Sequence, residues 1–316
     1  MATNQQAIPA TAVQTRQSSG VWRDAIGRLR KNRLAVVGFF GVCFLLFLGV
    51  FGPMLAPWPY YAQDTAAVAA NGFKPIPPFQ DPSHILGTDG LGQDMLSRML
   101  DGARISLTVA LVVQLVVLLI GVPIGALAGW YSGSRLDNGL MRFTDVMYAF
   151  PDLLLIILFS VAFRETAFGQ AMNGLLLVFV AIGLTAWVTV ARLVRGQFLS
   201  LKEMEFVEAA QAIGVSDRNI VIRHLLPNGI SPIIVAVTLG IPAAILAEAT
   251  LAYIGVGVQP PRASWGSLIA AGQPFIRSYP HLTYLPGIMI AAALISFTFL
   301  GDGLRDALDP KLKGKQ

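Results

Sequence analysis

Six long apolar runs constrain the fold of this chain more than any other feature of its sequence. Each run is close to the roughly 20 residues that cross a hydrocarbon core as a helix, and a helix satisfies all of its own backbone polar groups there. Of the 316 residues, 54% are hydrophobic and 13% are charged, more apolar surface than a soluble domain can cover. We therefore expect an all-α polytopic membrane protein with six transmembrane helices. The expected spans are residues 34–56, 107–130, 140–163, 171–193, 230–256 and 285–304.

The distribution of basic residues predicts the orientation of these spans. With the N-terminus inside, 17 of the 23 Lys and Arg residues fall in cytosolic segments and 6 fall outside, and such an excess marks the cytosolic side. We expect a multi-pass protein of the plasma (inner) membrane with both termini cytosolic, and no nucleic-acid partner. Around the first span we expect four further parts: a partly disordered cytosolic tail at 1–33, an extracytoplasmic loop at 57–106, a transmembrane domain at 107–304 and a second cytosolic tail at 305–316.

The segment between the fourth and fifth runs, residues 201–228, is polar and helix-prone. Phe206, Ala210 and Ile213 are spaced to share one stripe of a helix. Gly214 is expected to end that helix, since glycine adopts the left-handed conformation common at helix C-termini. The segment is therefore expected to leave the membrane as a helical loop on the cytosolic side.

A second short helix is expected to begin after Ser216, which can cap it, and to end at Pro227. This helix-turn-helix resembles the EAA loop of ABC importer permeases, although His224 stands where many members have Ile. In that family the loop is the coupling helix that docks into a groove on a cytosolic ATPase. The positions that match the signature are Glu208, Ala209, Ala210, Gly214, Leu226 and Pro227.

Further motifs resemble the dipeptide, oligopeptide and nickel branch of these permeases. They include residues 149–155, the segment 255–272 and the C-terminal end of the chain, and Gln93 stands where the branch usually has Arg. The resemblance implies the type I ABC importer permease fold. It is also carried by a string before the second span: His84, Leu86, Gly87, Thr88, Asp89, Gly92, Asp94, Ser97, Arg98, Gly102, Arg104 and Ser106.

The segments between the spans give three local expectations. Residues 95–101 alternate apolar and polar faces and are expected to form a separate helix at the outer membrane surface. Trp265 is expected either to anchor the chain at the interface or to contact an external binding protein. Gly129, Gly133 and Gly139 predict a tight turn between the second and third spans.

Charged residues and prolines inside the spans are candidates for translocation or gating, because charge at membrane depth is costly. These candidates are Pro151, Asp152, Pro242 and Glu248. Proline removes a backbone hydrogen bond, so the spans are expected to be kinked at Pro151 and near Pro242. Glu248 either lines the pathway or is neutral and hydrogen-bonded to a neighbouring helix. Arg142 and Asp145 are three residues apart and are expected to pair, in a structural role or a transport role.

The resemblance implies a permease subunit that moves di- or oligopeptides by alternating access. Its implied partners are a second homologous permease, two cytosolic ABC ATPases that bind ATP and Mg, an extracytoplasmic solute-binding protein, the peptide and membrane lipid. Nickel or another small solute is an alternative cargo. An ATPase-independent channel or carrier and an intramembrane enzyme are the rival classes.

The motifs that the sequence lacks support a chain without catalysis of its own. No phosphate-binding GxxxxGK motif is present, so ATP hydrolysis is expected on separate subunits. The three histidines lie far apart in the sequence, and no metal site or other cofactor is expected. The single cysteine, Cys43, excludes a disulfide within the chain.

Overall fold

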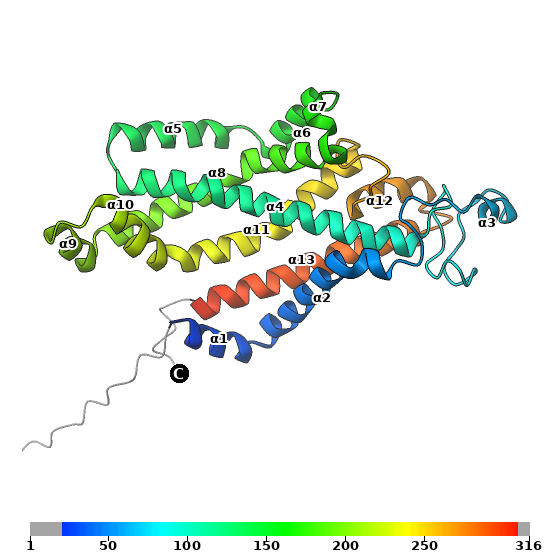
Figure 1. Cartoon of the computed structure of the whole chain (residues 1–316), viewed down its shortest axis with the longest axis horizontal. Coiled ribbons are helices and arrows are strands. Elements are labelled where there is room, and N and C mark those ends of the chain that lie inside the picture. The colour runs from blue at the N-terminus through cyan, green and yellow to red at the C-terminus, as the bar shows by residue number, and fades with distance from the viewer. Residues whose placement is uncertain (1–20, 309–316) are drawn as a thin grey trace, which may run out of the picture.

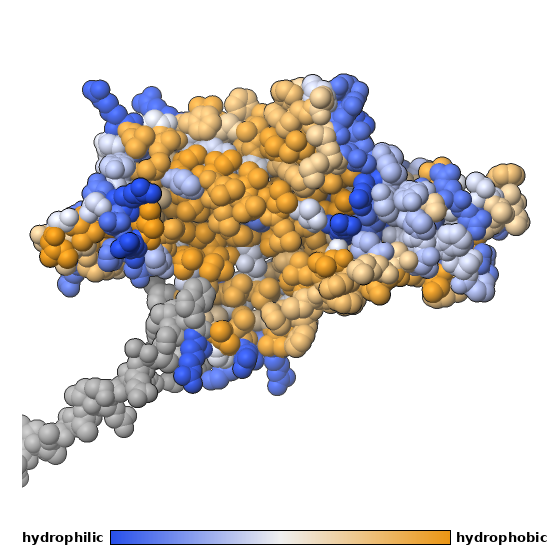
Figure 2. Space-filling view, in the orientation of Figure 1, coloured by the Kyte–Doolittle hydropathy of each residue, from blue (hydrophilic) through white to orange (hydrophobic). Residues whose placement is uncertain are grey.

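A computed structural model describes residues 21–308 (Figure 1), so the expected disorder of residues 1–20 and the tail beyond residue 308 lie outside the described part. Within it, five helices are long and apolar enough to cross a membrane. Figure 2 shows hydrophobic side chains over the middle of the bundle and hydrophilic ones gathered toward its two ends. The five helices are α2 (Arg33–Leu55), α4 (Met95–Trp130), α8 (Leu175–Lys202), α11 (Leu226–Ile254) and α13 (His281–Leu308).

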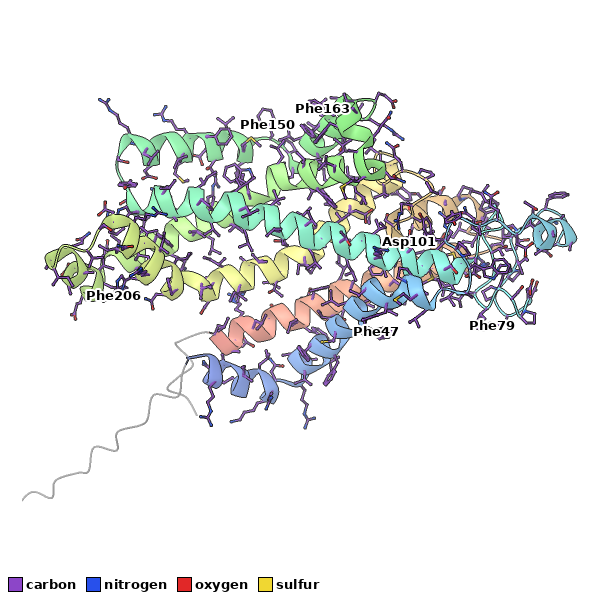
Figure 3. The ribbon with its side chains drawn as sticks, in the orientation of Figure 1. Phe47, Phe79, Asp101, Phe150, Phe163 and Phe206 are labelled. Carbon is purple, nitrogen blue, oxygen red and sulfur yellow. The ribbon has the colours of Figure 1, made fainter. Side chains whose placement is uncertain are left out.

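The third expected span, residues 140–163, is instead a broken pair of helices, α5 (Arg135–Ala149) and α6 (Asp152–Phe163), which meet at an angle of 85°. The backbone of Pro151 and of the residue before it is extended, as the steric demands of a proline ring favour. The kink expected at Pro151 is therefore confirmed, in the stronger form of a complete break. Figure 3 shows Phe150 at this break and Phe163 at the far end of α6.

Shorter elements lie at the ends of the bundle. We call the two ends the α9 end and the α12 end, after helices that Figure 1 places there. Basic helix α1 packs on the end of α13 through Ala25 and Leu29, which contact Ala307 and Leu308. The shorter elements are α1 (Val21–Lys31), α3 (Thr65–Ala70), α7 (Ala167–Gln170), η1 (Ala171–Gly174), α9 (Glu205–Ala212), α10 (Asp217–Ile220), η2 (Val221–Leu225), α12 (Trp265–Gly272) and η3 (Gln273–Phe275).

The expectation of a separate surface helix at residues 95–101 is wrong. Asp94 caps a helix that runs without interruption from Met95 to Trp130, so the segment is the first part of the second span. Its expected polar face is also buried, since Ser97 is 1% exposed and Asp101 is 2% exposed. The apolar side and the polar side of this helical segment are therefore both covered by protein, and the polar groups find partners inside the protein.

Trp265 packs against this first part of α4, and both roles expected for it are wrong. The side chain is fully buried between α4 and α12, and its indole N–H donates to the carbonyl oxygen of Met99 at 3.2 Å. A Cβ at Gly102 would lie 2.9 Å from the Trp265 ring, so glycine lets the indole approach the α4 backbone. Asp101 completes the contact by accepting a 2.7 Å hydrogen bond from Arg262.

Helices α4 and α8 pack closely through a row of glycines on α4. A Cβ at Gly121 would lie 2.8 Å from the carbonyl oxygen of Trp187, and one at Gly125 would overlap the carbonyl oxygen of Ala191. Gly129 continues the row one turn later, where a Cβ would lie 2.5 Å from the Phe198 side chain. Small residues four apart are a common means of close helix packing in membranes, where dispersion drives association.

The expectation that Gly129, Gly133 and Gly139 together form a tight turn is wrong for two of the three. Gly129 lies inside α4 and Gly139 inside α5, and only Gly133 occupies the turn, with a φ of 79°. Spacing alone did not distinguish the glycine required by a helix contact from the glycine required by a turn.

Ion pairs hold α5 against α8. Arg195 forms two 2.8 Å hydrogen bonds with the carboxylate of Asp137, which is buried at the start of α5. Arg192 pairs with Asp145 at 2.6 Å on the more exposed side. The expected pair between Arg142 and Asp145 is therefore wrong, because Asp145 faces α8 and meets an arginine from another helix.

We expect Gly125→Ala to destabilise the protein, because the added methyl group forces α4 away from α8, and overpacking of this kind costs about 1–3 kcal/mol. Gly287→Ala in α13 is the matched control, since a Cβ there meets nothing within 4 Å. Thermal unfolding in detergent, followed by tryptophan fluorescence, should show a lower midpoint for Gly125→Ala alone. Equal midpoints for the two variants would contradict the close contact.

Candidate functional site

The first candidate site is the α9 loop, which we define as residues 203–225 between α8 and α11. Its inner face is apolar and belongs to the main core of the bundle, together with Val194 and Phe198 of α8. This packing fixes the loop to the ends of the two long helices that carry it. The buried residues on the inner face are Val207, Ala210, Ile220 and Leu225.

Helix α9 ends in a Schellman motif centred on Gly214, as expected. The Gly214 N–H donates to the carbonyl of Gln211 at 2.9 Å, and the Val215 N–H donates to the carbonyl of Ala210 at 3.0 Å. Gly214 has a φ of 80°, and a Cβ there would meet nothing within 4 Å. Glycine is therefore favoured by backbone conformation alone, and the space around it is open.

The outer face of α9 exposes apolar side chains at the end of the bundle. Ile213 is 80% exposed and Phe206 is 38% exposed, and Figure 3 shows Phe206 at the α9 end. The expected stripe of Phe206, Ala210 and Ile213 is wrong as one surface, because Ala210 is buried with Val207. Glu208 and Ala209 lie on the exposed side with Phe206.

The second half of the loop departs from a simple capped helix. Ser216 occupies the position before α10, but its side chain makes no capping hydrogen bond. A π-helical turn, η2, then joins α10 directly to α11, and Pro227 lies in the first turn of α11. The expectation that Pro227 ends a helix is wrong. A π turn changes the backbone bonding just before the proline, which lacks an N–H and cannot continue a regular ladder from the preceding turn.

The second candidate site is a cavity of about 660 Å³ between α4, α6, α8 and α11. It lies near the middle of these long helices, at Gln114 of α4 and Gly240 of α11. Small residues of α11 form much of one wall: Ala236, Gly240, Ala243, Ala244 and Ala247. Four further lining residues, Gln114, Thr185, Thr189 and Thr250, were not expected from the sequence, although each is a polar residue inside an apolar run.

The four residues singled out for translocation or gating are not brought together in one place. Asp152 lines the cavity, and Pro151 precedes it at the break between α5 and α6. Pro242 lies inside α11, which remains one continuous helix through it. Neither Pro242 nor Glu248 is among the residues that line the cavity.

Glu248 is fully buried at a junction of three helices nearer the α12 end. The Ser106 hydroxyl of α4 donates to Glu248 Oε2 at 3.1 Å and accepts from the backbone N–H of Trp265 at 3.2 Å. This geometry supports the alternative in which Glu248 bonds to a neighbouring helix. The carboxyl group links α11 to α4, and through Ser106 to the start of α12.

Family models match two parts of the chain. One describes the inner membrane component of binding-protein-dependent transport systems and covers residues 121–314. The other describes the N-terminal transmembrane domain of oligopeptide transport permease C and covers residues 20–78. The first match alone spans more than half of the chain and includes both candidate sites except for the part of α4 before residue 121.

Curated relatives align over nearly their whole lengths. The oligopeptide transport system permease protein OppC of Bacillus subtilis (strain 168) is 38% identical over 95% of this chain and 92% of the relative. The dipeptide transport system permease protein DppC of the same strain is 41% identical over 94% and 88%. The OppC protein of Escherichia coli (strain K12) is 40% identical over 93% of each chain.

Among solved structures, an inward-facing crystal form of the MetNI methionine ABC transporter contains a similar fold. The TM-score is 0.55 at 19% sequence identity, and the alignment covers 68% of this chain and 98% of that chain. At this identity the likeness concerns the fold, which is that of an ABC importer permease. Together with the family models and relatives, it shows that this chain belongs to the family of inner membrane components of binding-protein-dependent transport systems.

Proposed function

We propose that this chain is a permease subunit of an ATP-driven importer that moves di- or oligopeptides across the plasma membrane. The observation that carries the proposal is the α9 loop, which combines a buried apolar inner face with exposed Phe206 and Ile213. Apolar side chains on a polar loop outside the spans indicate a protein contact. The relatives named for oligopeptide and dipeptide transport support the choice of cargo.

In the proposed orientation the α9 end and both termini face the cytosol, and the α12 end faces outward. The α9 loop then meets one of two ABC ATPases, which bind ATP and Mg and carry out hydrolysis. Glu205 and Glu208 lie in the first turn of α9, where the helix dipole favours carboxylates. The coupling residues in this proposal are Glu208, Ala209, Ala210, Gly214, Leu226 and Pro227.

The remaining partners are those of a binding-protein-dependent transport system, the family to which the chain belongs. The cavity is lined by residues of α4, α6, α8 and α11. We therefore include a second homologous permease that completes the pathway, and an external solute-binding protein that delivers the peptide at the α12 end. Movement of the α9 loop is transmitted along α8 and α11, and the break at Pro151 lets α5 and α6 move separately.

The cavity favours a peptide over nickel as the cargo. No histidine is among the described residues that line it, and imidazole is the side-chain nitrogen ligand that suits nickel. The volume of about 660 Å³ lies in the range of roughly 300–1,000 Å³ that small ligands occupy in proteins. A short peptide fits both the volume and the mixed polar and apolar lining.

We expect Ile213→Asp to weaken binding of the ATPase at least about tenfold, since burying an isoleucine contributes about 1.5–3 kcal/mol. Phe79→Asp is the matched control, because Phe79 is 81% exposed at the opposite end and Ile213 is 80% exposed. The measurement is the amount of ATPase that copurifies with each permease variant from cells expressing all subunits. Undiminished recovery with Ile213→Asp would remove the docking role.

We expect Gly214→Ala to loosen the α9 loop, because a left-handed backbone costs a residue with a Cβ about 1–2 kcal/mol. Hydrogen exchange of the amides of Gly214 and Val215 should become faster, and peptide-stimulated ATP hydrolysis should fall. Gly196→Ala in α8 is the control, as a Cβ there also meets nothing within 4 Å but its φ is not positive. If both variants exchange like the unchanged chain, the loop does not depend on the glycine.

A further inference from the structure

Asp152 is the only ionisable residue among the described residues that line the cavity. It is the first residue of α6, directly after the break at Pro151, and its side chain is exposed. Charged groups at membrane depth usually face a protein partner or a water-filled space. Asp152 therefore puts a carboxylate into the cavity from the one span that is not a continuous helix.

Among the residues that the structure describes, the other carboxylates of the neighbouring spans have partners, and Asp152 does not. Asp137 pairs with Arg195, Asp145 pairs with Arg192, and Glu248 accepts from Ser106. Within residues 21–308, Asp152 has no hydrogen bond from a side chain and no ion pair. Its charge is balanced only by the N-terminal end of α6, which is worth about 0.3–1 kcal/mol at such a position.

The rest of the polar lining also consists largely of acceptors. The hydroxyl groups of Thr185 and Thr250 donate to carbonyls of their own helices, Ile182 and Leu246. Their free lone pairs are left to accept hydrogen bonds from a ligand. No lysine or arginine is among the described residues that line the cavity, and Gln114 supplies the one side-chain amide among them. This lining therefore offers a carboxylate ligand neutral donors but no positive charge.

An ammonium group has the opposite character, with three donors, no acceptor and a positive charge. We propose that the Asp152 carboxylate binds the ammonium group of the passing substrate, which for a peptide is its free amino end. This assignment rests on the proposed function and specifies how that site recognises its cargo. The amino end is held at Asp152 by a charge-assisted hydrogen bond, and the remainder of the peptide lies along the small residues of α11.

The first test measures the charge preference of the cavity in the assembled complex and does not depend on transport. Thr189 lines the cavity and is exposed, so Thr189→Cys in a Cys43→Ala chain provides a reporter thiol. A cationic and an anionic methanethiosulfonate of similar size are compared by mass spectrometry of this chain. With Asp152 present the cationic reagent should react about tenfold faster, because a carboxylate in the same cavity attracts a cation and repels an anion.

Two variants show whether Asp152 causes that preference. Asp152→Asn is nearly isosteric and should bring the two rates close together, while Asp152→Glu should keep the preference. A ratio that Asp152→Asn leaves unchanged would overturn the proposal. So would a preference for the anionic reagent, which would mean that a partner subunit places a cation beside Asp152.

The second test uses trialanine as the substrate of the complex reconstituted with its ATPases and a saturating amount of binding protein. Asp152→Asn should lower ATP-driven uptake about tenfold, and Asp152→Glu should restore much of it. Uptake by Asp152→Asn equal to that of the unchanged chain would overturn the ammonium site alone. Failure of the unchanged chain to import any peptide would instead overturn the proposed function, and the charge preference would still be measured.

A protection experiment covers the case in which Asp152→Asn does not assemble. In the chain that keeps Asp152, millimolar trialanine should slow cationic labelling of Thr189→Cys. The desamino analogue of trialanine lacks the ammonium group and should protect much less. Equal protection by both compounds would contradict recognition of the amino end.

Discussion

The close contact between α4 and α8 is the interaction on which the rest of the structure depends. Lipid is as apolar as the helices, so the hydrophobic effect does not drive two apolar helices together and dispersion at short range does. Glycine permits the closest approach of two helix backbones. Gly121, Gly125 and Gly129 bring the α4 backbone onto α8 over three successive turns. α8 continues from this contact into the α9 loop, so a force on the loop acts on the centre of the bundle.

Buried carboxylates also join the helices, through hydrogen bonds inside the protein. α5 is held to α8 by Asp137 and Arg195, and α11 is held to α4 by Glu248 and Ser106. Each bond joins helices that are distant in sequence and gives a buried carboxylate a hydrogen-bond partner, without which its burial would be costly. Among the described residues Asp152 has no such partner, and it lies at the cavity and at the break between α5 and α6.

The helical architecture was largely predictable from the sequence, because hydrophobic length depends on the membrane and not on tertiary contacts. The apolar runs located the five long helices and the broken pair α5 and α6, and the conformational demand of Gly214 located the end of α9. Other residues could not be assigned, because their roles depend on which helix lies opposite. Gly129 was expected in a turn and packs on α8, and Trp265 was expected at a surface and is fully buried.

In the two candidate sites, too, some features could be predicted from the sequence and others depend on packing. Phe206, Ala210 and Ile213 follow helical spacing, but only packing on the core decides that Ala210 turns inward. Asp152 was recognisable as a charge inside an apolar run, whereas Thr189 became visible as a lining residue only when α8 was placed beside α11. Local conformation can be inferred from local sequence, and the lining of a shared cavity cannot.

Coupling to ATP hydrolysis requires that the α9 loop faces the cytosol and meets an ATPase there. Ser216 is exposed on this loop, so Ser216→Cys in a Cys43→Ala chain gives a single thiol to follow. A membrane-impermeant maleimide should label it only after cells are opened, and a short bifunctional maleimide should join it to the ATPase. Labelling of Ser216→Cys in intact cells would place the loop outside and contradict the account.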